Sequence, residues 1–308
     1  MPNDQLSPQK TTDKNFADFI AGGIAGASAG VLVAPLEVLK VHQQALPHTS
    51  TTGNLTRYFS VKSLPSAIKG IPSAVQNYFT PELRWNMIKA IPNFSMMFAG
   101  VCALEFSVNA SVKERYGNIA GFTASAVTGA AFLSCADQFL YRRHLGQSPS
   151  DAFKDIRQYG IGRLFTGFQP MFGREFCFVT SMLGVGPAIA KQLHNDEKTS
   201  PTEIENWAGQ TIAGLTTNTI SHPFDALTRK MQIAFQENPS KKQSFFKTAA
   251  DTLKNDRRFL SKGLAPRLAL ATYGQAVATA AFRAFRPKLE TERNDLAATS
   301  TAVSLKKR

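Results

Sequence analysis

The sequence lacks an uninterrupted apolar segment of about 20 residues, the length that a simple transmembrane helix requires. Hydrophobic residues make up 43% of the chain and charged residues 19%, and the mean hydropathy is slightly negative. These values alone fit a soluble helical protein. Helices that line a polar cavity, however, carry small and charged residues on one face and lipid-facing residues on the other. Composition therefore leaves both a soluble protein and a polar-lined membrane bundle open.

Cysteine is scarce, and the N-terminal residues lack the marks of a targeting peptide. Cys102, Cys135 and Cys177 are widely spaced and odd in number, so we expect buried reduced thiols rather than a disulfide framework. Residues 1–15 have no apolar core, carry two aspartates and lack arginine, unlike secretory and mitochondrial leaders. We expect any mitochondrial address to lie within the mature chain.

Motifs of the common enzyme classes are also missing. The sequence contains no phosphate-binding P-loop, no His-Glu-x-x-His zinc site and no Gly-x-Ser-x-Gly nucleophile elbow. The five histidines are dispersed and fall mostly near the ends of expected helices. We therefore expect no enzyme activity, no cofactor and no metal.

The chain has a formal net charge of +13. Such an excess suits nucleic acid, an anionic membrane surface or an anionic solute. The basic residues are scattered, without zinc-finger spacing, an RNA-binding signature or a long basic block. Nucleic acid is thus disfavoured, and a small anionic solute and membrane lipid are the expected partners.

A pattern recurs along the chain about every 100 residues. It consists of a helix rich in small residues, then an acid two positions after an anchor residue, then a polar link and a second helix. The anchors and acids are Pro35 with Glu37, Cys135 with Asp137, and Pro223 with Asp225. Glycines four residues apart, such as those at 22 and 26, suit close helix–helix approach, and Pro35 and Pro223 are expected to kink their helices.

The second helices are expected near residues 84–105, 174–189 and 267–285. The polar links at residues 49–69, 147–163 and 236–262 should lie on one side of the membrane. Short helices are expected in the last two links, near residues 152–158 and 245–253. We expect residues 1–15 and the polar residues 289–308 to be disordered tails.

Three such repeats resemble the mitochondrial carrier family over residues 16–288, divided at about 16–116, 117–200 and 201–288. The first and third repeats match the Pro-x-[Asp/Glu]-x-x-[Lys/Arg] motif well, and the second matches it poorly. The resemblance implies an all-α membrane protein with six transmembrane helices in three pseudo-symmetric repeats and short matrix-side helices. It further implies a monomer in the mitochondrial inner membrane, with cardiolipin at helix starts near Gly167 and Gly263.

By this resemblance, ion pairs between the motifs close the matrix-side end. The three acids are Glu37, Asp137 and Asp225, and the three positions for cations hold Lys40, Leu140 and Thr228. With Lys40 as the one cation in place, we expect a pair between Lys40 and Asp137. Arg142, Arg229 and Lys230 either replace the missing cations or face matrix water and lipid phosphates.

The opposite gate of the family uses [Phe/Tyr]-[Asp/Glu]-x-x-[Lys/Arg] on the second helix of each repeat. The nearest match is Leu104 and Glu105, with Val108 where a cation belongs. We expect both closed states to have fewer ion pairs than a typical carrier, and transport to be either loosely coupled or directionally biased.

The resemblance places the substrate contacts at the middle of the second helices. They are Lys89, Asn93, Met97, Arg174, Glu175 and Leu270. A cation within an apolar helix is costly unless it faces a water-filled path, so Lys89 and Arg174 are the main candidates for holding a carboxylate or phosphate. The alternatives are a structural pair between Arg174 and Glu175, and a Lys89 that reaches to the membrane rim.

The signals for the solute conflict. In this family an arginine followed by an acid, as at Arg174, accompanies amino-acid-like solutes. The surroundings of Lys89 resemble the ADP/ATP carrier, although its Arg-rich run is absent here. A resemblance to the nucleotide carriers that Legionella-type bacteria send to host mitochondria slightly favours a nucleotide. A carrier-like receptor or insertase without transport is the remaining alternative.

Overall fold

The computed structural model describes residues 8–45, 81–144, 149–194, 199–238, 244–256, 260 and 263–306. None of these residues lies in a strand. The elements in chain order are α1 (Pro8–Ala45), α4 (Pro81–Tyr116), α5 (Asn118–His144), α6 (Pro149–Tyr159), η2 (Ile161–Phe165), α7 (Phe168–Thr180), η3 (Ser181–Val185), α8 (Gly186–Leu193), α9 (Glu203–Glu237), α10 (Phe245–Asn255) and α11 (Leu264–Lys306).

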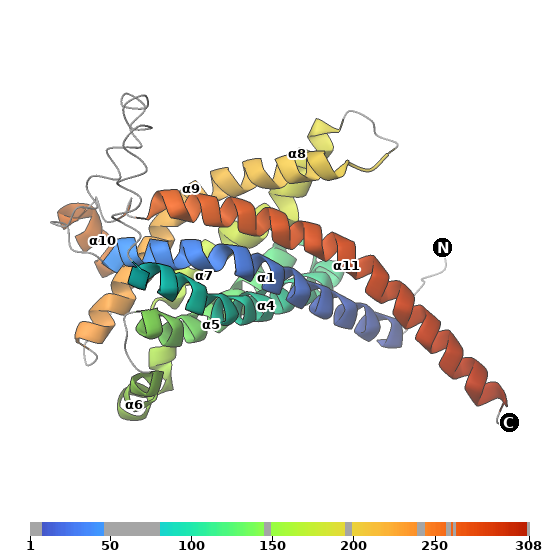
Figure 1. Ribbon diagram of the computed structural model, residues 1–308, viewed down its shortest axis with the longest axis horizontal. Helices are drawn as coiled ribbons and strands as arrows, with labels where there is room; N and C mark the ends of the chain where they lie inside the picture. Colours follow the sequence, from blue (N-terminus) through green and yellow to red (C-terminus); the bar gives the residue numbers. More distant parts are fainter. Residues whose placement is uncertain are drawn as a thin grey trace.

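The long helices contact one another in a closed ring, and Figure 1 shows them lying lengthwise along the bundle. Because η3 continues α7 into α8, these three elements act as one long segment. Each long segment packs against the next in chain order, from α1 through α4, α5, α7–α8 and α9 to α11, and α11 packs back against α1. Three consecutive helix pairs thus close on themselves, which confirms the all-α carrier architecture expected from the repeats.

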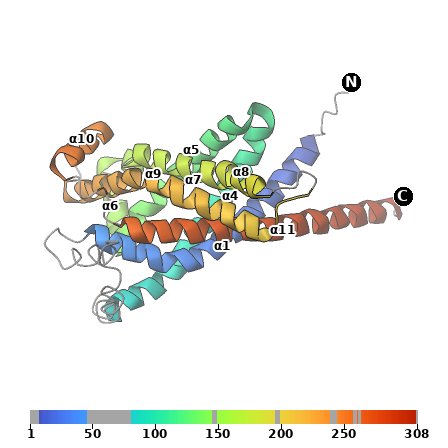
Figure 2. The same ribbon diagram turned by 90° about the horizontal axis from the view of Figure 1, so that it is seen from above.

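The short helices α6 and α10 lie at the same end of this bundle (Figures 1 and 2). They contain the two segments for which short helices were expected, residues 152–158 and 245–253. The beginning of α1 and the end of α11 lie towards the opposite end. The link at residues 49–69 lies outside the described residues.

Polar side chains lie inside the bundle, and apolar side chains cover much of the outside. On α9 the exposed large apolar residues are Ile204, Trp207, Ile212, Leu215 and Ile220. The same helix buries Gln210, Asn218, His222, Asp225 and Arg229. A water-soluble protein has the opposite distribution, so this pattern fits a helix between lipid and a polar interior.

Four described segments are long and apolar enough to cross a membrane, by length and composition. They are Phe16–Val38, Ile88–Tyr116, Asn118–Phe139 and Phe168–Leu193. The segments α9 and α11 also have the required length, and their buried polar residues include Asp225 and Arg229 on α9 and Gln275 on α11. The absence of a plain apolar run from the sequence follows from this division of each helix into two faces.

Glycines bring α1 and α4 into close contact. A Cβ on Gly26 would lie 2.0 Å from the carbonyl oxygen of Phe98, and one on Gly22 would lie 2.7 Å from that of Cys102. A Cβ on Gly30 would lie 2.5 Å from the Cα of Ser95. Since these glycines are spaced by four residues, they form one face, as expected for small-residue helix packing.

Helix starts follow from local chemistry. The helix α9 begins with a capping box, in which the Glu205 amide donates to the Thr202 hydroxyl at 3.3 Å and the Thr202 amide donates to the Glu205 carboxylate at 2.7 Å. The helices α7 and α11 each follow a glycine with positive φ, Gly167 at 86° and Gly263 at 77°. Glycine suits both positions because this backbone conformation disfavours residues with a Cβ.

The two tails that were expected to be disordered are helical, and the helices with internal prolines continue past them. Helix α1 already begins at Pro8, and α11 continues to Lys306, so both tails are helical over most of their described length. Residues 289–308 are rich in Ala, Leu, Glu, Lys and Arg, which favour helix despite their polarity. Helices α1 and α9 continue through Pro35 and Pro223, so each proline removes a hydrogen bond without ending its helix.

We predict that Gly26→Ala destabilises the protein by about 1–3 kcal/mol, because the new methyl group would overlap the backbone of α4. Gly23→Ala is the matched control, since its Cβ would meet nothing closer than 3.8 Å. Thermal unfolding in detergent measures both. Equal stability of the two variants would contradict the close α1–α4 packing.

Candidate functional site: a central cavity and its ion-pair network

A cavity enclosing about 520 Å³ of empty space, part of it open to solvent, lies among the six long segments. Each of them contributes at least one lining residue. The lining residues are Glu37, Met97, Phe98, Val101, Leu133, Asp137, Arg174, Glu175, Phe178, Asn218, Arg267 and Leu270. Because every long segment lines this cavity, it lies at the centre of the bundle.

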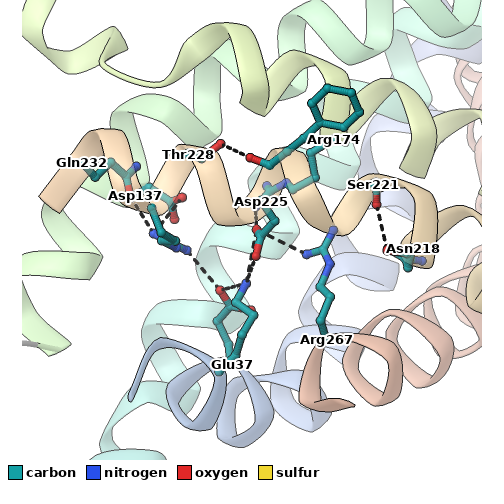
Figure 3. A network of polar contacts seen from close by, with 12 residues as sticks. Glu37, Asp137, Arg174, Asn218, Ser221, Asp225, Thr228, Gln232 and Arg267 are labelled. Carbon is teal, nitrogen blue, oxygen red and sulfur yellow. Dashed lines mark hydrogen bonds and ion pairs between the residues drawn. The ribbon is translucent and has the colours of Figure 1, made fainter. Parts of the chain in front are cut away.

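Asp225 on α9 is the centre of the ion-pair network at this cavity (Figure 3). One of its oxygens lies 3.1 Å from Nη1 of Arg174 and 3.7 Å from Nη1 of Arg267. The other lies 3.2 Å from Nζ of Lys40. This carboxylate, whose side chain is 1% exposed, thus meets cations from α7, α11 and α1.

Arg229 links the other two motif acids. Its guanidinium lies 3.1 Å from the Glu37 carboxylate on α1 and 3.2 Å from the Asp137 carboxylate on α5. Lys40 is in turn 2.6 Å from Glu37. Arg229 and Asp225 are four residues apart and therefore lie on the same face of α9. This face carries Asp225 itself and, through Arg229, contacts Glu37 and Asp137.

The expected pair between Lys40 and Asp137 is wrong. Lys40 contacts Glu37 and Asp225, and Arg229 holds Asp137 instead. The physical reason is the length of the arginine side chain, which spans from α9 to both α1 and α5. The hydroxyl of Thr228, at the motif position itself, donates to the carbonyl of Phe224 at 2.9 Å within its own helix.

The other two substitute cations do not share the position of Arg229. Lys230 lies 3.5 Å from Asp256, the residue that follows α10, in a half-exposed pair. Arg142 lies in α5, and its side chain falls outside the described residues. All three motif acids are nevertheless paired. The expectation of fewer ion pairs than in a typical carrier stays a prediction.

Arg267 is a network residue that the sequence analysis missed. It lies one turn before Leu270 on α11 and is 6% exposed. The available signal was its place directly after Gly263 and Pro266, where the second repeat has Met171. A lone arginine at the start of a helix is an ordinary surface feature, so the signal was weak.

Four of the six expected substrate contacts line the cavity, namely Met97, Arg174, Glu175 and Leu270. Arg174 is 7% exposed, and its guanidinium lies 2.5 Å from Glu175 and 3.1 Å from Asp225. It therefore lies at the cavity, as expected of a substrate contact, and also forms the structural pair that was the alternative.

Lys89 and Asn93 are not among the cavity-lining residues. Lys89 is exposed, and its ammonium lies 5.2 Å from the centre of the Trp85 ring. The Asn93 amide donates to the Lys89 carbonyl at 3.5 Å. The structure thus does not bring Lys89 to Arg174.

Uncharged polar residues cross the bundle at a second level. The Gln275 amide of α11 donates to Gln210 of α9 at 2.7 Å and to the Ser181 hydroxyl of η3 at 2.9 Å. All three side chains are buried. At the end nearer the start of α1, Arg286 pairs with Asp18, which ties α11 to α1.

Cardiolipin binding near Gly167 and Gly263 stays a prediction.

The model of the family described as mitochondrial carrier protein matches residues 11–77 and 201–293. The chain therefore belongs to the mitochondrial carrier family and is a multi-pass membrane protein that carries small metabolites. The matched segments fall in the first and third repeats, where the proline and the acid of the motif are both present. The second repeat, with Cys135 at the anchor position, lies between them.

Named relatives include two fungal proteins and one vertebrate protein. The mitochondrial glycine transporter of Aspergillus niger is 25% identical over 252 residues, which cover 74% of this chain and 77% of the relative. That of Coccidioides immitis is 25% identical over 324 residues, covering 89% and 90%. The mitochondrial coenzyme A transporter of Xenopus tropicalis is 25% identical over 269 residues, covering 76% and 73%.

We predict that Asp225→Asn lowers the stability of the detergent-solubilised protein by about 3–5 kcal/mol, because it leaves buried cations without their shared carboxylate. Asp256→Asn removes a half-exposed acid and should cost about 1 kcal/mol or less. Thermal unfolding at neutral pH compares the two variants. A similar small loss in both would contradict the central role of Asp225.

Proposed function

We propose that this carrier moves a small amino acid of the glycine type across the mitochondrial inner membrane by alternating access. The observation that carries the proposal is the adjacent pair Arg174 and Glu175, buried at the central cavity. The printed names of the fungal relatives, mitochondrial glycine transporters, support the same class of solute.

The pair suits a zwitterion. A guanidinium holds a carboxylate through two parallel hydrogen bonds, and a carboxylate accepts hydrogen bonds from an ammonium group. Neighbouring residues of opposite charge can thus receive the two ends of one amino acid without adding net charge to the cavity. A glycine-sized solute also needs little space beyond these two contacts.

Binding would also act on the closed end. Arg174 holds Asp225 at 3.1 Å, so a solute carboxylate that engages Arg174 competes with Asp225 for the same guanidinium. Losing this contact weakens the attachment of α9 to α7. A solute shifts a conformational equilibrium only through such a difference in interaction between the two states.

The nucleotide expectation has less support. It depended on the surroundings of Lys89, which lies outside the cavity lining and against Trp85. Because one relative is named a coenzyme A transporter, a phosphate-bearing solute should also be tested. The cavity-lining cations Arg174 and Arg267 are already engaged by acids, so a polyphosphate would have to displace more than one ion pair.

Purified protein in liposomes should take up labelled glycine in preference to ATP and coenzyme A. Arg174→Lys keeps the charge but loses the planar fork, and Glu175→Gln loses the acceptor for the ammonium group. We expect each to reduce glycine uptake by at least about tenfold, which corresponds to about 1.4 kcal/mol of lost interaction. Membrane insertion should be unchanged.

Exposed residues provide the matched controls, Arg157→Lys on α6 and Glu203→Gln on α9, which should retain uptake. Preferred uptake of ATP or coenzyme A would overturn the amino-acid proposal. Failure to move any solute of the panel would favour the carrier-like receptor.

A further inference from the structure

Asn218 carries a buried hydrogen-bond acceptor that the bundle does not use. It lies on α9, the helix of Asp225 (Figure 3), is 1% exposed and lines the central cavity. Its amide nitrogen donates to the Gly214 carbonyl at 2.7 Å, one turn earlier in the same helix. Its amide oxygen, Oδ1, has no hydrogen-bond partner among the described residues. Because an unpaired buried acceptor is unfavourable, this oxygen is a candidate for contact with a solute.

Contacts between α7–α8 and α9 show where Asn218 lies along the cavity. A step forward along one segment matches a step backward along the other, so the two run antiparallel. Their register places Asn218 opposite Phe178, which also lines the cavity. Phe178 follows Arg174 by four residues, about one turn or 6 Å, so Asn218 lies one turn from the arginine proposed to hold the solute. The pairs that set the register are Gly167 with Thr228, Gly173 with Phe224 and Gly186 with Gln210.

The polar side chain at this position is specific to the third repeat. Asn218 precedes the anchor Pro223 by five residues, and the positions five residues before the other two anchors hold Gly30 and Ala130. Both of these are buried, so packing at this level of the bundle does not require a polar group. A solute with different groups at its two ends needs such a departure from threefold symmetry in the cavity that receives it.

We propose that Asn218 is a specificity-determining residue, whose Oδ1 accepts a hydrogen bond from an N–H group of the transported solute. This inference rests on the proposed function, which supplies the solute. An ammonium group has three N–H donors, and the Glu175 carboxylate is also held by Arg174. A second acceptor is therefore needed once water is excluded, and Asn218 provides it. A solute with fewer N–H donors leaves this oxygen unpaired and binds less well.

Asn218→Leu tests whether the acceptor is unpaired in the protein itself. The substitution keeps a similar shape and replaces an unpaired buried polar group with an apolar one, which stabilises a fold. We expect the unfolding temperature in detergent, without solute, to rise by about 2–4 °C. Thr219→Val is the matched control, because the next residue on α9 is exposed and its hydroxyl donates within its own helix, to Leu215. A lower unfolding temperature of Asn218→Leu would overturn the proposal, since Oδ1 would then have a partner in the protein.

Uptake into liposomes tests the contact with the solute. Glycine offers three N–H donors and N,N-dimethylglycine offers one. We expect Asn218→Leu and Asn218→Ala each to lower the preference for glycine over N,N-dimethylglycine by at least about tenfold. One variant fills the space of the amide and the other enlarges it, so a shared loss of preference reports the acceptor rather than the volume. Thr219→Val should keep the preference of the wild type.

The two proposals can fail separately. An unchanged preference in both Asn218 variants would overturn the role of this residue, even where the wild type transports glycine. Preferred uptake of ATP or coenzyme A by the wild type would instead overturn the glycine proposal. Both of these solutes carry N–H groups, so Asn218→Leu should then reduce uptake of the preferred one by at least about tenfold, and undiminished uptake would overturn the role of Asn218 as well. A wild type that moves no solute of the panel would overturn both.

Discussion

Buried charges that must be paired determine the state of this molecule. The carboxylate of Asp225 meets cations from three other segments, and all of these groups lie away from water. Removing charges from water costs several kcal/mol per ion, which the attraction between them largely offsets. The net stability of the paired network is thus a small difference between a large cost of desolvation and a large electrostatic attraction. Water entering the cavity can replace the ion pairs, which suits a gate better than a permanent brace.

The arrangement of α9 makes this balance possible. Its outer face carries large apolar side chains and its inner face carries Asp225 and Arg229 one turn apart. Pro223, just before them, cannot donate a backbone hydrogen bond, so the helix lacks one of its own ties near the charged turn. A local weakening beside the network lets one segment bend without unfolding.

The repeats were predictable from sequence because they rest on backbone chemistry. Glycines spaced by four residues on α1 and prolines two residues before Glu37 and Asp225 are visible without partners, and the family resemblance that they carry implied the bundle of helix pairs. The partners of Lys40 and Asp137 were not predictable. They depend on how far a side chain reaches between helices, and Arg229 lies one position from the motif yet spans two acids. The sequence also did not show that Lys89 lies beside Trp85 and is not among the cavity-lining residues.

Threefold pairing is replaced here by an uneven arrangement. In the motif pattern each repeat supplies one acid and one cation, whereas the second repeat supplies Asp137 without a described cation at its motif position. Lys40 and Arg229 each contact two motif acids, and Arg174 and Arg267 reach Asp225 from α7 and α11. Two of the second helices, which line the cavity, thereby contact the motif acid Asp225 directly. Under the proposed function, a solute that draws Arg174 away would act on Asp225 through a single guanidinium, so no chain of intermediate contacts would be needed to connect occupancy of the cavity with opening of the network.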